Sequence, residues 1–291
     1  MKRVMLPAMP SQNRKRYQLQ KSASSSSSST ARGPSVEIDI ADNESIPSDS
    51  VAAFEAVVQQ VSSTSGFPLA IPGCFLHQIP MIIRDRNVVN HELYVARTKG
   101  VLRHIHVEGC GLLLCRERDY RGLVQGLLEA ARRDQTAQSE ADVLERFLSK
   151  VLPMSTDLAI PQKRLLGLME VRKDDEQNAV VTLLRLGFIV FQTHGPDVEN
   201  ESSFWFTLPN MRTLIDEVEA GRSEFVKMIQ RGKPHREVMK SKLLAKKKFK
   251  GSSLSMEFHI KDAVGSGVVV ARDTALEGKH SVFLLPDKLT G

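Results

Sequence analysis

The sequence has few aromatic residues and few cysteines, and both shortages narrow the classes of protein to which it can belong. Aromatic residues make up 5% of the 291 residues, whereas hydrophobic residues make up 41%, so we expect small, aliphatic, mainly helical cores. The three cysteines, Cys74, Cys110 and Cys115, are an odd number and form no C-x-x-C pair. They predict neither a disulfide framework nor a zinc site, and we expect buried thiols in a reducing compartment.

Long apolar runs and nucleotide-binding motifs are missing as well. No run approaches the length of a membrane span and the N-terminus has no signal-peptide core, which predicts a soluble, intracellular protein. The sequence contains no G-x-x-x-x-G-K-[ST], H-R-D, D-F-G or A-P-E motif, so nothing would position a nucleotide and its magnesium. We therefore expect no enzymatic activity and no cofactor. A protein serine/threonine kinase remains an alternative that specific ATP binding would support.

Other patterns that resemble catalytic or metal sites have simpler interpretations. The G-x-G at residues 109–111 lies between two expected strands and is typical of a tight hairpin turn. His104 and His106 alternate on a strand without further ligands at a recognisable spacing, so we expect surface histidines and no metal. The acidic residues 174–176 are typical of a helix N-terminus, where they complement the helix dipole.

A pattern that returns three times is the most informative feature present. Each copy is a helical stretch, a glycine, an apolar strand, a polar gap and a second apolar strand. The glycines at 100, 187 and 267 are spaced for three small domains of one kind, because a solenoid repeat would be shorter. A helix that ends at glycine and leads into a two-stranded hairpin is the second half of a winged helix. Winged helices mostly bind nucleic acids or proteins.

The expected architecture is α+β and mostly helical, with three tandem winged-helix domains that carry two-stranded β-wings. The expected boundaries are a disordered basic and Ser-rich tail, then three domains, at residues 1–48, 49–135, 136–210 and 211–291. Apolar spacing predicts helices that we place, approximately, at residues 51–65, 86–99, 120–132, 140–152, 160–169, 174–186, 211–229, 235–247 and 259–264.

The N-terminal tail carries two basic clusters, Lys2-Arg3 and Arg14-Lys15-Arg16, around ten residues apart. This spacing suits a bipartite nuclear import signal. A generic solubilising tail or a flexible arm on phosphates is the alternative. We expect the protein in the nucleus.

Positive charge is concentrated in one segment. The chain has a net charge of +6 and a pI near 9.2. Residues 221–250 hold eleven Lys or Arg and two Glu, a local net charge of +9, so the rest of the chain sums to −3. Binding to a polyanion needs several cations on one face, because the affinity comes from summed counterion release.

Candidate DNA-binding residues follow from this charge. The first group surrounds Pro234 and the expected helix 235–247: Arg231, Lys233, Arg236, Lys240, Lys247 and Lys248. Three of them, Arg236, Lys240 and Lys247, recur at i, i+4 and i+11 opposite the apolar residues, although a solvated helix face is the simpler alternative. Arg84 and Arg86, at the start of the expected helix 86–99, form a second group, while Lys99 and Arg103 are weaker candidates.

Two further observations define the kind of binding. Aromatic residues are not interleaved with the basic ones, which favours contact with a duplex backbone, at low sequence specificity, over stacking on single strands. The loop at 195–202 is acidic, so the middle domain is more suited to spacing the others or to binding proteins.

With these residues in view, the chain resembles the family historically named serine/threonine-protein kinase 19, over about residues 50–289. The resemblance rests on short strings in a specific order: Asp85-Arg86, residues 147–153, Leu186-Gly187, residues 203–209, residues 228–244 and residues 283–286. It implies three tandem winged helices that bind double-stranded DNA in the nucleus, and no kinase activity.

The resemblance also implies a role and partners. The role is in transcription-coupled nucleotide excision repair, bridging stalled RNA polymerase II, the Cockayne syndrome ubiquitin-ligase subunit and the transcription/repair factor with its helicase. The family's DNA-contacting positions correspond to Arg86, Arg231 and Lys233. The main alternative is a winged-helix protein–protein adaptor without DNA affinity, which a shallow salt dependence would support.

Overall fold

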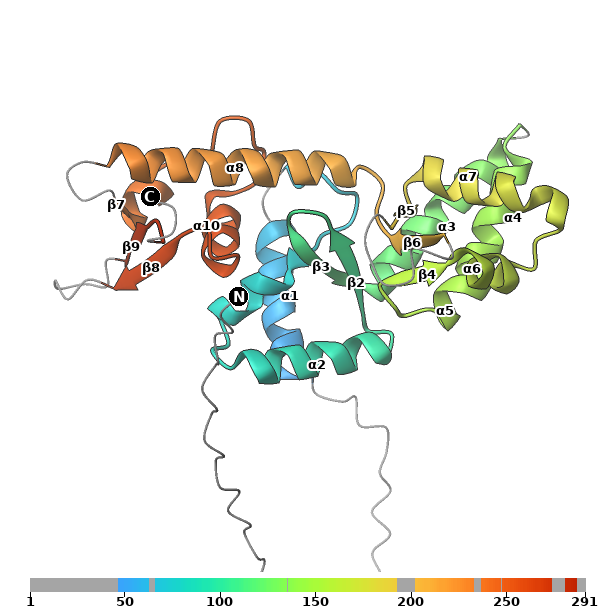
Figure 1. Cartoon of the computed structure of the whole chain (residues 1–291), viewed down its shortest axis with the longest axis horizontal. Helices are drawn as coiled ribbons and strands as arrows, with labels where there is room; N and C mark the ends of the chain where they lie inside the picture. Colours follow the sequence, from blue (N-terminus) through green and yellow to red (C-terminus); the bar gives the residue numbers. More distant parts are fainter. Residues whose placement is uncertain are drawn as a thin grey trace, which may run out of the picture. The chain divides into compact units, whose positions relative to one another are not determined.

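The computed structural model describes residues 47–62, 66–134, 136–192, 202–232, 237–246, 248–273 and 281–286. Residues 46–291 form one compact unit by their internal contacts. The N-terminal tail with its two basic clusters and most of the acidic loop near residue 197 lie outside the described residues. The fold is α+β, with small antiparallel sheets among many helices (Figure 1).

One order of elements occurs three times: a helical part, a short strand, a second helical part and two further strands. The first set contains α1 (Asp49–Ser62), β1 (Cys74–Phe75), the 3-10 helix η1 (Leu76–Met81), α2 (Arg86–Thr98), β2 (Leu102–Val107) and β3 (Gly111–Arg116). The second set follows the connecting helix α3 (Glu117–Arg133) and contains α4 (Gln138–Arg146), the π-helical η2 (Phe147–Val151), α5 (Leu152–Met154), β4 (Ala159–Pro161), α6 (Gln162–Met169), η3 (Lys173–Asp175), α7 (Glu176–Leu186), β5 (Ile189–Phe191) and β6 (Ser203–Phe206). The third set contains α8 (Met211–Arg231), β7 (Glu237–Met239), α9 (Lys240–Leu244), α10 (Met256–Gly265), β8 (Val270–Asp273) and β9 (Ser281–Leu284).

Each set holds a three-stranded antiparallel sheet, in the orders β1-β3-β2, β4-β6-β5 and β7-β9-β8. The hairpin of each sheet is the one that the sequence predicts. The third strand is an addition of two or three residues that pairs with the last strand of its set, as Cys74 pairs with Leu114. These strands are too short to show the alternation by which a strand is recognised in a sequence.

The three repeated glycines end helices, as the sequence predicts. Gly100, Gly187 and Gly267 have φ of +68°, +77° and +78°, in the left-handed region that side chains disfavour. Each lets the chain leave its helix within a few residues of the hairpin. The turn at 108–110 between β2 and β3 is also confirmed.

The prediction of one helix over residues 235–247 is wrong. Residues Glu237–Met239 form strand β7, with Val238 opposite Phe283 of β9, and of the described residues in this segment only Lys240–Leu244 are helical. Pairing with a buried strand outweighs the helix-forming composition of this segment. The spacing i, i+4, i+11 therefore has no continuous helix on which to define a face, and Arg236 and Lys247 lie outside the described residues.

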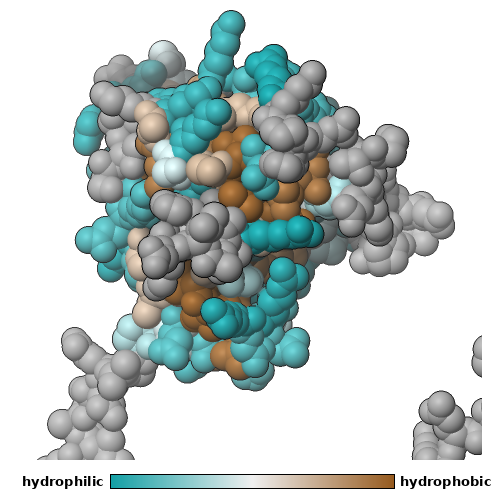
Figure 2. Space-filling model, turned by 90° about the vertical axis from the view of Figure 1, so that its left-hand side faces the viewer, coloured by the Kyte–Doolittle hydropathy of each residue, from teal (hydrophilic) through white to brown (hydrophobic). Residues whose placement is uncertain are grey.

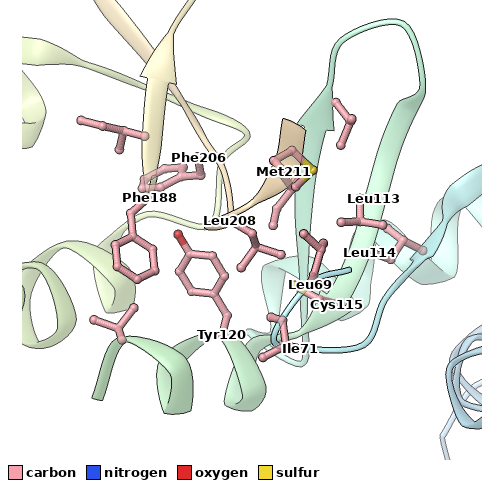
Figure 3. Packing of buried hydrophobic residues seen from close by; sticks show 14 of the residues in the cluster. Leu69, Ile71, Leu113, Leu114, Cys115, Tyr120, Phe188, Phe206, Leu208 and Met211 are labelled. Carbon is pink, nitrogen blue, oxygen red and sulfur yellow. The ribbon is translucent and has the colours of Figure 1, made fainter. Parts of the chain in front are cut away.

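The first and second sets share one hydrophobic core. Tyr120 of α3 is fully buried, its ring meets the edge of Phe188 at 5.9 Å, and its hydroxyl donates to the carbonyl of Thr207 at 3.1 Å. Figure 3 shows Tyr120 between Phe188 and Phe206 on one side and Ile71 and the neighbouring first-set residues on the other. Because α3 contributes to both sets, it is part of the core that joins them.

The third set has a second core and a contact with the first set. Its core includes the clustered rings of Phe225, Phe249 and Phe283. Helix α10 packs against η1 of the first set, where Phe258 meets the edges of Phe67 and Phe75. The three sets are thus joined by buried contacts.

The expected state of the cysteines is confirmed, since all three are buried and free. Burial raises the pKa of the Cys115 thiol to about 12. Among the described residues, no helix has the length and apolar character needed to cross a membrane, and no group of His, Cys, Asp and Glu has the geometry to hold a metal ion.

Candidate nucleic-acid interface

Helix α2 presents an exposed polar face that begins with cations. Asp85 caps the helix by accepting hydrogen bonds from the backbone amides of Asn87 at 2.9 Å and Val88 at 3.2 Å. Val89, Leu93 and Ala96 face the core. The opposite face carries exposed Arg86, Asn87, Asn90, His91 and Tyr94.

Arg84 and Arg86 lie at the N-terminal end of this face. Both side chains belong to exposed residues, and neither has an ion-pair partner among the residues that the structure describes. Their role as a DNA contact stays a prediction. Two unpaired arginines are available to a polyanion without first breaking an internal ion pair.

Three of the six candidate residues of the third set lie among the described residues. Arg231 is exposed at the C-terminal end of α8, Lys240 is exposed at the start of α9, and Lys248 is exposed beside Gly66 of the first set. Lys233, Arg236 and Lys247 lie outside the described residues. Figure 2 views the end of the molecule that carries β7, β8 and β9, where hydrophilic residues surround smaller apolar areas.

Arg103 was a weaker candidate, and its burial removes it. Its side chain is 2% exposed and makes two hydrogen bonds to Glu117, at 2.7 and 3.0 Å. Burial alone would lower the pKa of Arg103, but the hydrogen bond from the guanidinium to Glu117 raises it overall. The guanidinium also lies over the rings of Tyr120 and Phe206. Arg103 thus stabilises the joint between the first and second sets.

The prediction that His104 and His106 are surface residues is wrong for His104, whereas His106 is half-buried. His104 is buried, and burial together with the nearby Arg97 lowers its pKa to about 4. His106 stacks on Trp205 of the second set, with ring centroids 4.6 Å apart. Five of the six residues of β2 are buried, so the alternation of polar and apolar residues does not indicate a solvent face.

A cluster of buried charged side chains connects the first set to the third. The sequence analysis did not predict it. Asp262 of α10 is fully buried and accepts two hydrogen bonds from Arg222 of α8, both at 2.8 Å. It also accepts one from His77 of η1 at 2.9 Å. Arg222 donates further to the carbonyl of Gly109, in the turn of the first hairpin, at 3.0 Å. We call these three side chains, Asp262, Arg222 and His77, the joint cluster.

The joint cluster has a close backbone approach beside it. A Cβ atom at Gly265 would overlap the carbonyl oxygen of His77, so glycine is required for α10 to reach η1. Sequence reasoning could not find this cluster, because His77 and Asp262 are 185 residues apart and no local pattern connects them. The joint cluster therefore connects the first set, which carries α2, directly to α8 and α10 of the third set.

Three small antiparallel sheets, each built with helices in one repeated order, define a winged-helix-like α+β protein. The chain matches the family described as "Inactive serine-threonine protein kinase 19" over residues 44–280, and it belongs to that family. The family's description agrees with the missing nucleotide-binding motifs.

Three relatives carry the name "Winged helix repair factor 1". The one from Homo sapiens is 24% identical over 260 residues, which cover 88% of this chain and 92% of the relative. The one from Xenopus laevis is 27% identical over 210 residues, covering 70% of this chain and 73% of the relative. The one from Dictyostelium discoideum is 27% identical over 141 residues, so the match spans 47% of this chain but only 34% of that longer relative.

Proposed function

We propose that this protein is a nuclear scaffold that binds double-stranded DNA with low sequence specificity and takes part in DNA repair. In this proposal each of the three sets is a winged-helix domain, with boundaries near residues 49–135, 136–210 and 211–291. In this proposal the protein acts by binding and not by catalysis. The relatives' name, which contains the words repair factor, supports the repair role.

The observation that carries the proposal is the exposed face of α2. Its N-terminal end holds two arginines without ion-pair partners among the described residues, and Asn87, Asn90 and His91 follow along the same helix. A major groove about 12 Å wide admits an α-helix, and arginines at its edge contact phosphates. The basic segment 221–250 supplies further cations, of which Arg231, Lys240 and Lys248 lie among the described residues.

The finer role follows from the family resemblance. We place the protein in transcription-coupled nucleotide excision repair, at RNA polymerase II stalled by a lesion. The protein partners would then be the polymerase, the Cockayne syndrome repair proteins and the transcription/repair factor with its helicase. The basic clusters of the tail support entry into the nucleus.

A salt series tests the DNA-binding proposal. The full chain is titrated onto a fluorescent random duplex, beside an Arg84→Gln/Arg86→Gln variant and an Arg133→Gln/Arg212→Gln control. The control removes two charges that are mostly exposed and already paired, to Glu129 and Asp216. We expect steep salt dependence for the parent and the control, and a slope shallower by about 2 for the first variant. Equal slopes for the variant and the control would remove α2 from the interface.

The adaptor without DNA affinity remains the second candidate, and one observation favours it. Residues 136–210 contain eleven acidic and seven basic residues, so the second set repels a polyanion overall. Val190 and Phe191 of its edge strand β5 are 46% and 55% exposed, which suits a protein contact. If the unmodified protein shows no binding to the duplex even at low salt, the hypothesis of a protein–protein adaptor replaces that of a DNA scaffold.

A further inference from the structure

A positively charged groove lies where the first set meets the second. It has a volume of about 440 Å³ and is lined by the C-terminal end of α2, the first turns of α3 and the segment around α5. Its cations are Lys99, Arg118 and Arg121, and its apolar lining comes from Leu152 and Pro153. Sequence reasoning treated Lys99 as a weak candidate and did not connect it with α3.

The cations of the groove form few ion pairs with described residues. Lys99 is exposed and has no ion-pair partner within the described part of the chain. The Arg118 side chain is 78% exposed and lies 3.5 Å from Asp119, which is itself bound to Arg116 at 3.0 Å. Arg121 is held at 3.1 Å by Glu117.

The one acidic residue that lines the groove is already neutralised. The Glu117 side chain is 9% exposed and accepts two hydrogen bonds from the buried Arg103 besides the one from Arg121. The groove therefore has three cations around a single carboxylate that is already paired, and its net charge is positive. Such a surface is complementary to a polyanion, since each Lys or Arg that neutralises a phosphate releases a condensed counterion and so adds to the affinity.

The position of the groove indicates which anion it meets. Helix α2 has 13 residues, so its two ends are about 20 Å apart. Arg86 begins the helix that Figure 1 labels α2 and Lys99 follows its last residue, with exposed polar residues between them. A helix in a major groove about 12 Å wide has one sugar–phosphate backbone on each side. The cations at the two ends of α2 are thus spaced to meet the two backbones.

We infer that the groove formed by Lys99, Arg118 and Arg121 binds the phosphodiester backbone of the duplex strand opposite the one that Arg84 and Arg86 contact. The inference rests on the proposed function. It assigns the start of α3 and the edge of the second set to the DNA interface, although the second set as a whole is acidic. The residue beside Lys99 fits this assignment, because Gly100 has open space around it and lets a backbone approach closely.

The test uses the full chain with Lys99→Gln and Arg118→Gln together. Both residues are exposed, and Asp119 keeps its contact with Arg116 when Arg118 is lost, so the fold should be intact. The Arg133→Gln/Arg212→Gln protein is again the matched control, with the same loss of two charges. A Lys99→Arg/Arg118→Lys protein preserves the charges of the groove. Thermal midpoints of all four proteins check that they are folded.

We expect the salt slope of the Lys99→Gln/Arg118→Gln protein to be shallower than that of the control by about 2. From ~50 to ~200 mM salt, the parent should then lose about tenfold more affinity than this variant does. The charge-preserving protein should keep the parent slope. A slope equal to that of the control would overturn the inference, and would leave the groove to an acidic protein segment.

The outcomes also separate this inference from the proposed function. If the parent binds with a steep slope and the groove variant behaves as the control does, the groove assignment fails and the DNA scaffold stands. If the parent does not bind at low salt, both fail together.

Discussion

Replacing Asp262 by Asn tests whether the joint cluster holds the first and third sets together. The carboxylate is fully buried and receives three hydrogen bonds, two from Arg222 and one from His77. An Asn side chain keeps the shape but has one acceptor oxygen, and it turns an NH₂ group toward donors. Arg222, with a side chain only 15% exposed, would keep a buried charge without its counter-charge.

The expected cost is large for a single substitution. Breaking a buried ion pair by removing one partner destabilises proteins by about 3–5 kcal/mol, because the remaining charge is left uncompensated. For a unit of this size, each kcal/mol lowers the midpoint of thermal unfolding by about 2–4 °C. We therefore expect the midpoint of Asp262→Asn to fall by on the order of 10 °C.

The stability that Asp262 contributes should depend on pH, and its lowered pKa gives the direction. The contacts with Arg222 and His77 outweigh burial and lower the pKa of Asp262 below its ordinary value. A group whose pKa is lower in the folded state contributes stability that is fully present above its unfolded pKa, about 3.9 for Asp. That contribution is lost as pH falls through the folded pKa. The difference between parent and variant should be full at neutral pH and shrink in acid.

The assay is chemical unfolding of the full chain followed by two signals. Trp205, the single tryptophan, stacks on His106 and reports the joint of the first and second sets, whereas far-ultraviolet circular dichroism reports all helices. Loss of the joint cluster should let the circular dichroism signal begin to fall before the fluorescence signal. Asp216→Asn is the control, since its carboxylate is 54% exposed and its ion pair contributes little. If Asp262→Asn costs no more than this control, the cluster does not hold the joint.

Three further predictions concern backbone approach, thiol reactivity and histidine titration. Gly265→Ala should destabilise the protein by about 1–3 kcal/mol, because the added Cβ overlaps a carbonyl of η1, whereas Gly126→Ala, with open space around it, should not lower the unfolding midpoint. Cys115 should resist alkylation at pH 8 until the protein unfolds, as mass spectrometry can follow, since burial raises its pKa to about 12. His104 and His259 have pKa values of about 4 because both are buried, so the unfolded chain binds protons at higher pH than the folded one. Stability should be full above about pH 6.5 and fall toward pH 4, and a midpoint that does not change over this range would contradict the assignment.

The parts of the fold that the sequence predicts are those with local causes. A glycine after an apolar helix, then two apolar segments, predicts each hairpin because the helix end and the turn are set by adjacent residues. Helix α2 follows from its cap at Asp85 and its apolar spacing. The three short strands β1, β4 and β7 depend on partners far along the chain, as Val238 depends on Phe283. The same distant pairing explains why a helix was wrongly predicted there.

In the candidate site, too, the sequence predicts what depends on neighbouring residues and not what depends on distant packing. Exposure of Arg84 and Arg86 follows from their place at a helix start, and the structure agrees with it. Lys99 just precedes the first hairpin and Arg103 lies on it, so the two look alike in the sequence, yet Arg103 is buried against Glu117 and Lys99 is exposed in the groove. Only the packing of the second set against the first separates them, and no periodicity along the chain contains that information.

Because buried contacts join the three sets, a partner that touches several of them meets cations at fixed separations. Modules on flexible linkers bind with an effective concentration that the linker sets, and each contact can form without the others. Here α10 reaches η1 at Gly265, and the joint cluster fixes Asp262 to both Arg222 and His77. Cations on α2 and α8 are therefore presented at fixed separations, and the entropy of arranging them is lost on folding and not on binding. A rigid partner with evenly spaced charges, such as a duplex, benefits from this arrangement more than a flexible acidic segment, which could adapt to a loose one.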